Sequence, residues 1–134
     1  ELARIDREVN EALPSDFMAT AVKEGRFRDA DLAHKGEGRA QILRSAAGTD
    51  LVRLTEFTVT NGPDLEVWLV KEPDPQTSDD VKQSEWVSLG PLKGNKGDQT
   101  YIVPEGTDIG AYGSVVIWCE QFGVLFSPAT LTEV

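Results

Sequence analysis

The stretch from Val115 to Cys119 is apolar at every position and constrains the fold more than any other part of the chain. Side chains alternate between the two faces of a strand. Val115, Ile117 and Cys119 therefore share one face, and Val116 and Trp118 share the other. Because both faces are apolar, this strand must be covered on both sides or closed inside a barrel.

Turn-forming residues divide much of the remaining chain into short segments rich in β-branched and aromatic residues. The predicted strands cover residues 51–60, 65–70, 86–89, 100–103 and 114–126, and Gly123 splits the last into two strands or bends it. Residues 71–82 are expected to form an acidic surface loop. This pattern predicts an all-β domain, an antiparallel β-sandwich or a barrel-like fold.

The first residues follow a different pattern. Leu2, Ile5, Val9 and Ala12 are spaced as on one face of a helix, and Pro14 ends the pattern. A second, weakly helical piece is expected after residue 15, ending at residue 25. We therefore expect residues 1–24 to form a helical spacer with a short N-terminal helix, and residues 25–134 to form the β domain.

The chain is acidic, with 13 Lys and Arg against 23 Asp and Glu residues and a net charge of −10. This charge repels phosphate backbones and anionic lipid surfaces, which argues against nucleic-acid and membrane-surface binding. Carboxylate-rich loops leave calcium as a possible ligand. The sequence does not begin with Met, and we therefore expect an upstream segment. This segment would tether the domain to a membrane, while the domain itself would not be inserted.

Cys119 is the single cysteine, so it cannot form an intramolecular disulfide. It is a buried apolar filler, a reactive thiol or one half of an intermolecular bond. His34 is the single histidine and is either structural or a partner of Cys119, as a base, a haem ligand or a copper ligand. Two such residues do not make a Cys/His zinc site.

Polar and aromatic residues offer further candidates. Asn61, Asp64 and Asp98 lie at predicted turns, where such side chains usually bond the nearby backbone. The sequence from Asn61 to Asp64 predicts a tight turn, because Asn and Gly tolerate a positive φ and Pro supplies a fixed one. The larger aromatic residues fit a core or a sugar-binding face; they are Trp68, Trp86, Trp118, Tyr101 and Tyr112.

An ordered set of short motifs then suggests a family. The motifs are Gly25-x-Phe27, His34-x-x-Gly-x-Gly38, Phe57, Asn61-Gly62-Pro63-Asp64-Leu65, Leu89-Gly90-x-Leu92-Lys93-Gly94-Asn95, Gly97-Asp98-Gln99-x-Tyr101-x-x-Pro104 and Tyr112-x-Ser114-Val115-Val116-Ile117-Trp118-Cys119-x-x-Phe122. In this order they resemble the DM-thirteen domain, the electron-transfer DM-thirteen family, from about residue 25 to residue 131.

The resemblance implies a β-rich extracytoplasmic module. Such domains accompany cytochrome-like DOMON domains in Skeletor-type animal proteins and occur in secreted or membrane-anchored bacterial proteins. The family's hallmark cysteine corresponds to Cys119 here, which implies a redox role as a bare thiol or as a ligand to a prosthetic group such as haem.

The leading hypothesis is therefore a bacterial extracytoplasmic redox or electron-transfer accessory domain that works with a redox partner protein and is not a stand-alone enzyme. It uses Cys119, with His34 and Trp118 as neighbours. Asn61, Asp64, Asp98 and Tyr101 are the second-rank candidates, and the metal is left open. The alternative is a non-catalytic binding module for a glycan, a surface component or a partner protein, stabilised by calcium.

Overall fold

The structure is a computed structural model that describes residues 7–13 and 18–134. These residues form nine strands, one α-helix and one 3₁₀ helix. In chain order the elements are β1 (Ala19–Arg26), β2 (Gly36–Ser45), β3 (Asp50–Val59), β4 (Leu65–Val70), α1 (Ser78–Lys82), β5 (Trp86–Pro91), β6 (Gln99–Ile102), η1 (Ile109–Ala111), β7 (Ser114–Cys119), β8 (Val124–Thr130) and β9 (Thr132–Glu133).

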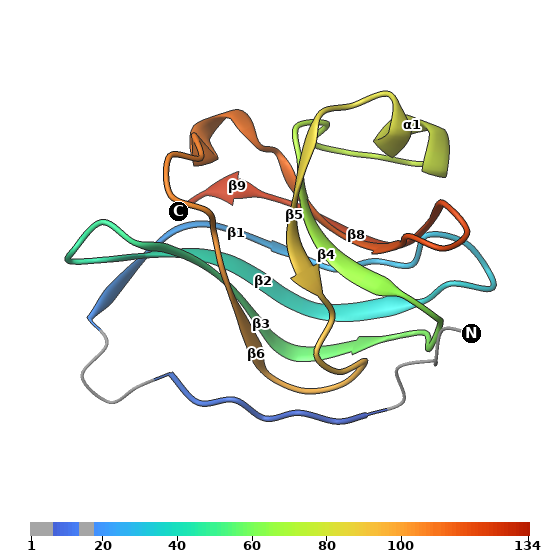
Figure 1. Ribbon diagram of the computed structural model, residues 1–134, viewed down its shortest axis with the longest axis horizontal. Coiled ribbons are helices and arrows are strands. Elements are labelled where there is room, and N and C mark those ends of the chain that lie inside the picture. The colour runs from blue at the N-terminus through green and yellow to red at the C-terminus, as the bar shows by residue number, and fades with distance from the viewer. Residues whose placement is uncertain (1–6, 14–17) are drawn as a thin grey trace.

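The strands form two antiparallel sheets. One has five strands in the order β6-β3-β2-β1-β9, and the other has four in the order β5-β4-β7-β8. In Figure 1, β4 and β5 cross in front of β2 and β3, and the two sheets lie against each other as layers. The prediction of an all-β antiparallel sandwich is confirmed.

Strand β7 lies between β4 and β8 and is buried along its whole length. Val115, Ile117 and Cys119 point into the core between the sheets. Val116 and Trp118 belong to a second apolar cluster, which includes a residue of α1 on the other face of the four-stranded sheet. The predicted division of this strand between two buried faces is therefore confirmed, and it explains why the strand is apolar at every position.

The predicted N-terminal helix is wrong for the residues that the structure describes. Residues 7–13 run as an extended segment (Figure 1), and Glu8 forms a parallel bridge with Lys96. Residues 2 and 5 of the helical pattern lie outside the described residues. The second helical piece is also wrong where it is described, because β1 begins at Ala19 and pairs with β2. The expected boundary between residues 24 and 25 thus falls inside a strand.

The residues before α1 explain why the predicted loop 71–82 contains a helix. Thr77 is the N-cap, its side chain accepts a hydrogen bond from the amide of Asp80, and the Asp80 carboxylate accepts one from the amide of Thr77. This reciprocal capping box satisfies amides that the first helical turn leaves open. Among the described residues, no helix has the length and apolar character needed to span a membrane.

Candidate functional site

Cys119 closes β7 at one end of the four-stranded sheet. It pairs with Leu65 of β4 and Val124 of β8 and has no exposed surface. Its Sγ donates a hydrogen bond to the carbonyl oxygen of Pro63, 3.1 Å away. The sulfur is therefore both enclosed by the core and directed toward the segment that leads into β4.

Pro63 also belongs to the wall of an open pocket, which we call the Cys119 pocket. Its volume is about 410 Å³. Three stretches of chain line it, with the residues Ala33, His34, Thr60, Asn61, Gly62, Pro63, Phe122, Val124 and Phe126. Cys119 does not line the pocket itself, so a single wall residue connects the thiol with the open space.

Gly62 allows this wall to pack closely. A β-carbon at this position would lie 2.6 Å from Cε2 of Phe126, well inside van der Waals contact. The loop backbone thus rests against the Phe126 ring. Asn61 and Gly62 tolerate a positive φ, but the left-handed residue of this turn is Asp64, with φ 53°.

His34 enters the pocket from the loop between β1 and β2. Its Nδ1 lies 2.9 and 3.0 Å from the two carboxylate oxygens of Asp31, and its ring packs on Phe126 with 4.4 Å between the ring centroids. The hydrogen bond from His34 is the main reason that the pKa of Asp31 lies below its usual value of 3.8. A carboxylate at Nδ1 favours the tautomer that leaves the Nε2 lone pair available.

Asn61 and Asp64 lie in the segment that carries Pro63. Asn61 lines the pocket, and the backbone carbonyl of Asp64 accepts a hydrogen bond from the amide of Glu120, which follows the cysteine. The structure therefore brings Cys119, His34, Asn61 and Asp64 to one end of the sandwich.

The other candidates make their contacts elsewhere. Asp98 accepts a hydrogen bond from the amide of Glu56 and lies 3.8 Å from Arg53. The Tyr101 hydroxyl accepts a hydrogen bond from the amide of Lys93, and burial raises the pKa of this phenol far above its usual value of 10. Both residues therefore hold the loop before β6. Trp118 neighbours Cys119 in the chain but lies on the opposite face of β7.

The residues of the site do not fit a haem ligated by Cys119. The sulfur has no exposed surface, and its hydrogen bond goes to a backbone carbonyl of the wall. His34 turns Nδ1 toward a carboxylate. Within residues 7–13 and 18–134, no three His, Cys, Asp or Glu side chains gather closely enough to hold a metal ion together.

Three residues of the site were missed by the sequence analysis as site residues. Phe122 is 63% exposed at the pocket, Phe126 supports His34, and Asp31 orients the imidazole. A signal existed for Asp31, because an acidic residue three positions before a histidine in a loop can reach its ring. No sequence signal joins the phenylalanines to His34, because the pocket is assembled from distant segments.

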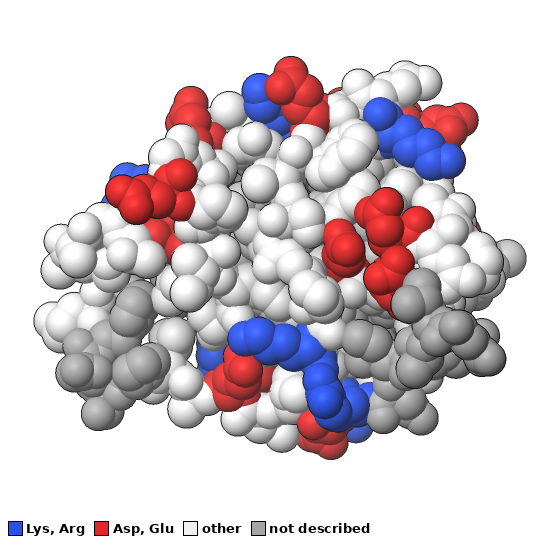
Figure 2. All heavy atoms as spheres, viewed as in Figure 1, with Lys and Arg blue, Asp and Glu red and all other residues white. Residues whose placement is uncertain are grey.

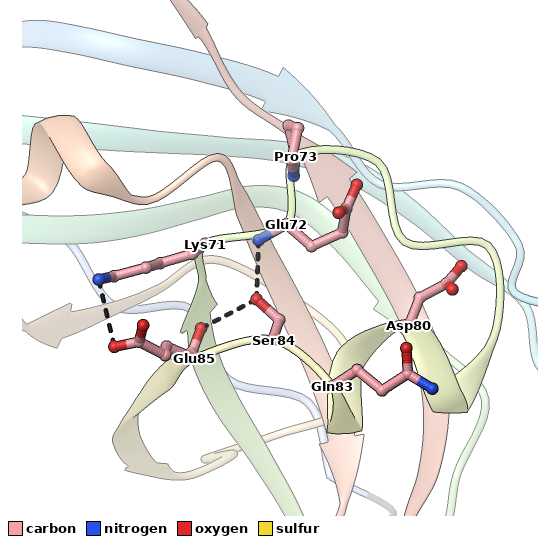
Figure 3. A pocket seen from close by; sticks show the side chains of 7 residues that line it. All are labelled: Lys71, Glu72, Pro73, Asp80, Gln83, Ser84 and Glu85. Atoms are coloured by element: carbon pink, nitrogen blue, oxygen red, sulfur yellow. Dashed lines mark hydrogen bonds and ion pairs between the residues drawn. The ribbon is translucent and has the colours of Figure 1, made fainter.

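A second hollow, with a volume of about 500 Å³, lies beside α1 and is shown in Figure 3. Its polar groups largely serve one another. Lys71 Nζ lies 3.3 Å from a carboxylate oxygen of Glu85, and the Ser84 hydroxyl accepts a hydrogen bond from the amide of Glu72 (Figure 3). Asp80 is engaged in the helix cap. This hollow therefore carries less chemistry than the Cys119 pocket.

Comparison with known proteins identifies one relationship. The family model described as electron transfer DM13 matches residues 26–131, which is most of the chain. The matched range includes all three segments of the Cys119 pocket and the whole of β7. No curated protein and no solved structure matches the chain.

Proposed function

The chain belongs to the electron-transfer DM13 family, and on this basis we propose that it is a redox accessory domain whose electron-carrying side chain is the Cys119 thiol. The observation that carries the proposal is the hydrogen bond from Cys119 Sγ to Pro63, a residue in the wall of the Cys119 pocket. The fold thus encloses a sulfur and still keeps it near the surface.

Burial decides which redox chemistry fits this thiol. Thiol–disulfide exchange requires the attacking sulfur to touch the partner's sulfur, and Cys119 has no exposed surface. Electron transfer without contact is compatible with the arrangement. In that step Cys119 gives one electron to a one-electron oxidant, such as an oxidised metal centre of a partner protein, and becomes a thiyl radical as its proton leaves.

The proton needs an acceptor near the pocket, and His34 supplies one. Asp31 holds Nδ1, so Nε2 is the basic nitrogen of the neutral ring. His34 is assigned as the acceptor of the proton released by the thiol, and it returns this proton when a one-electron reductant, such as a reduced metal centre of a partner protein, reduces the thiyl radical. The proposal also includes a location outside the cytoplasm, either secreted or tethered, as the family resemblance implies. Fractionation of cells that make the natural protein tests this location.

The direct test compares oxidation of the native protein with that of Cys119→Ser, with Cys119→Ala as the packing control. A soluble one-electron oxidant such as hexachloroiridate(IV) is titrated in, and its consumption is followed by absorbance while mass spectrometry reads the modified residue. The native protein should consume the oxidant faster than either variant, with the product at Cys119. Equal consumption by all three folded proteins would exclude the thiol as the electron donor.

A binding function at the same pocket is the second proposal, and the observation that favours it is the exposed Phe122 ring. It stands beside the polar Asn61 and the apolar Phe126 at one opening. Such a combination suits the mixed apolar and hydroxylated face of a sugar. Saturation-transfer NMR with a glycan panel tests it: a signal that Phe122→Ala abolishes supports binding, and a blank panel removes it.

A further inference from the structure

Three tryptophans stack in a row on the outer face of the four-stranded sheet, away from the main core. The rings of Trp86 and Trp68 are 4.7 Å apart between centroids and inclined by 2°, and those of Trp68 and Trp118 are 4.9 Å apart and inclined by 23°. They come from three adjacent strands, β5, β4 and β7. The row therefore crosses the sheet from its edge strand to the strand that carries Cys119.

The two ends of this row differ in exposure. Trp86 is 43% exposed, whereas Trp68 and Trp118 are each 3% exposed. Figure 2 shows that the described surface over β5, in the middle of this face, is free of charged side chains and is surrounded by acidic and basic groups. A reactant at the surface thus meets the first indole, while the other two are reached through it.

A carboxylate stands at the central ring. The Nε1 of Trp68 donates a hydrogen bond to Oε1 of Glu66, 2.9 Å away, and the same oxygen accepts one from the hydroxyl of Ser88 at 3.0 Å. Any hydrogen-bond acceptor would satisfy the N–H group of a buried indole. A carboxylate adds a base, and a base is what an indole needs when it loses an electron, because the radical cation is a far stronger acid than the neutral ring.

We propose that the indoles of Trp86, Trp68 and Trp118 form an electron path between the surface and the strand of Cys119, with Glu66 as the proton acceptor for Trp68. The inference rests on the proposed redox function and specifies the path by which electrons travel between Cys119 and the surface. Trp118 and Cys119 are adjacent residues, so one peptide unit connects the inner end of the row with the thiol. Rings in van der Waals contact exchange an electron without any diffusional step.

The electrons and protons balance in two stages. A one-electron oxidant at the surface takes one electron from Trp86. Trp68 then reduces the oxidised Trp86, and the Nε1 proton of Trp68 moves to Glu66. The products are the reduced oxidant, a neutral Trp68 radical and a protonated Glu66. In the second stage Cys119 transfers one electron through Trp118 to the Trp68 radical, Glu66 returns the proton to Nε1, and the thiol proton passes to His34, the acceptor proposed above, as the thiyl radical forms.

Laser flash–quench oxidation of the full chain tests this path. Tris(bipyridine)ruthenium is the photo-oxidant, suited to an acidic protein by its positive charge, with a cobalt(III) ammine as the irreversible quencher. Transient absorption separates the neutral indole radical from the radical cation. The native protein should give the neutral radical, and Trp68→Phe and Trp86→Phe should each lose it. Glu66→Gln, which keeps an acceptor but no base, should form it about a hundredfold more slowly.

Two further variants separate the path from packing and from the role of the thiol. Glu85→Gln changes the carboxylate that precedes Trp86 in the chain and should leave the signal unchanged. Trp118→Phe should still give the Trp68 radical but prevent its decay by oxidation of Cys119, which mass spectrometry reads. The near-ultraviolet circular dichroism of each variant shows that it is folded, and if Trp68→Phe does not fold, Glu66→Gln and Trp86→Phe carry the test.

The outcomes distinguish the path from the proposed function. A neutral radical that depends on Trp86 and Glu66 supports the path, even if Cys119 is never oxidised; in that case it is the role of the thiol that fails. A native protein that forms no such radical, or forms it equally in Trp86→Phe and Glu66→Gln, overturns the path. Oxidation of Cys119 by hexachloroiridate(IV) would then leave the thiol function standing alone.

Discussion

The Sγ of Cys119 lies 3.1 Å from the carbonyl oxygen of Pro63, and this hydrogen bond fixes a fully buried thiol behind the wall of an open pocket. A sulfur in this position is close to solvent without being exposed to it. Its reactivity toward reagents that must touch the sulfur is consequently controlled by how often the wall and the core around β7 open.

We expect native Cys119 to be strongly protected from iodoacetamide. The reagent must touch the sulfur, which requires an opening of the structure, so the labelling rate should follow the population of open states. Mass spectrometry over a series of urea concentrations below the unfolding transition measures this rate. The same protein in full denaturant provides the unprotected rate, and similar rates in native and denatured samples would contradict the burial.

A methyl group at Gly62 should disturb the pocket. In Gly62→Ala the new β-carbon would lie 2.6 Å from the Phe126 ring, so the ring must move away from its contact with His34. We expect a loss of about 1–3 kcal/mol in the free energy of unfolding, typical of overpacking, and faster labelling of Cys119. Urea denaturation and iodoacetamide labelling measure the two effects.

Gly48→Ala is the matched control for this variant. Gly48 has a positive φ of 87°, and no atom lies within 4 Å of the position that a β-carbon would take there, so alanine adds backbone strain without a collision. The strain costs about 1–2 kcal/mol. Labelling of Cys119 in Gly48→Ala at matched residual stability should stay close to that of the native protein. A similar acceleration in both variants would trace the effect to global stability.

The strands were predictable where the sequence pattern was strong. Strands β3 and β4 begin and end within a residue of their predicted limits, and the break near Gly123 separates β7 from β8. Alternation along β7 also grouped Cys119 with Val115 and Ile117 on one face, which is the face that packs into the core between the sheets. In each case a local property, the composition or the period of two, decides the result before any tertiary contact is known.

The N-terminal region and the pocket could not be predicted in the same way. The extended path of residues 7–11 depends on distant glycines: a β-carbon at Gly97 would collide with the carbonyl of Val9. A helical spacing of a few apolar residues says nothing about such a neighbour. Likewise His34, Pro63 and Phe122 meet only because two sheets bring three loops to one end of the sandwich.

Lys23 joins β1 to the 3₁₀ helix through its ammonium group. The residue is 7% exposed, and Nζ donates hydrogen bonds to the carbonyl oxygens of Ile109 and Tyr112, at 3.1 and 2.8 Å. Lys23→Met keeps the apolar stem but removes both donors, so two carbonyls lose a charged partner. We expect a loss of about 2 kcal/mol in the free energy of unfolding.

Urea denaturation of Lys23→Met measures this loss. Lys35→Met is the control, because Lys35 Nζ lies at the surface, 3.5 Å from Asp29, and exposed pairs contribute roughly 0–1 kcal/mol. Equal stability of Lys23→Met and the native protein would contradict this prediction. It would show that the free-energy cost of desolvating the ammonium group equals the stabilisation from its two hydrogen bonds.

Residues 7–11 form a segment, the N-terminal strap, that is held on the loop before β6 by a carboxylate. Glu11 accepts hydrogen bonds from Lys93 Nζ at 3.0 and 3.1 Å and from the amide of Thr100 at 3.0 Å. Burial alone would raise the pKa of Glu11, but the hydrogen bonds from Lys93 and Thr100 outweigh it and lower the pKa below 4.5.

The strap should therefore stabilise the protein in a pH-dependent way. A carboxyl group whose pKa is lower in the folded than in the unfolded state contributes its full stabilisation above the unfolded pKa, near 4.5, and loses it as the pH falls through the lowered folded pKa. Because Glu11 and Lys93 are both more than a third exposed, we expect the contribution to be below about 1 kcal/mol.

Thermal unfolding of the native protein and of Glu11→Gln from pH 7 to pH 3 measures this contribution. The native protein should melt at a higher temperature above pH 5, and the melting temperatures of the two proteins should converge in acid. Glu105→Gln, at an exposed loop position, is the control for the change in net charge. A difference between native and Glu11→Gln that persists undiminished at pH 3 would show that the ionised carboxylate does not hold the strap.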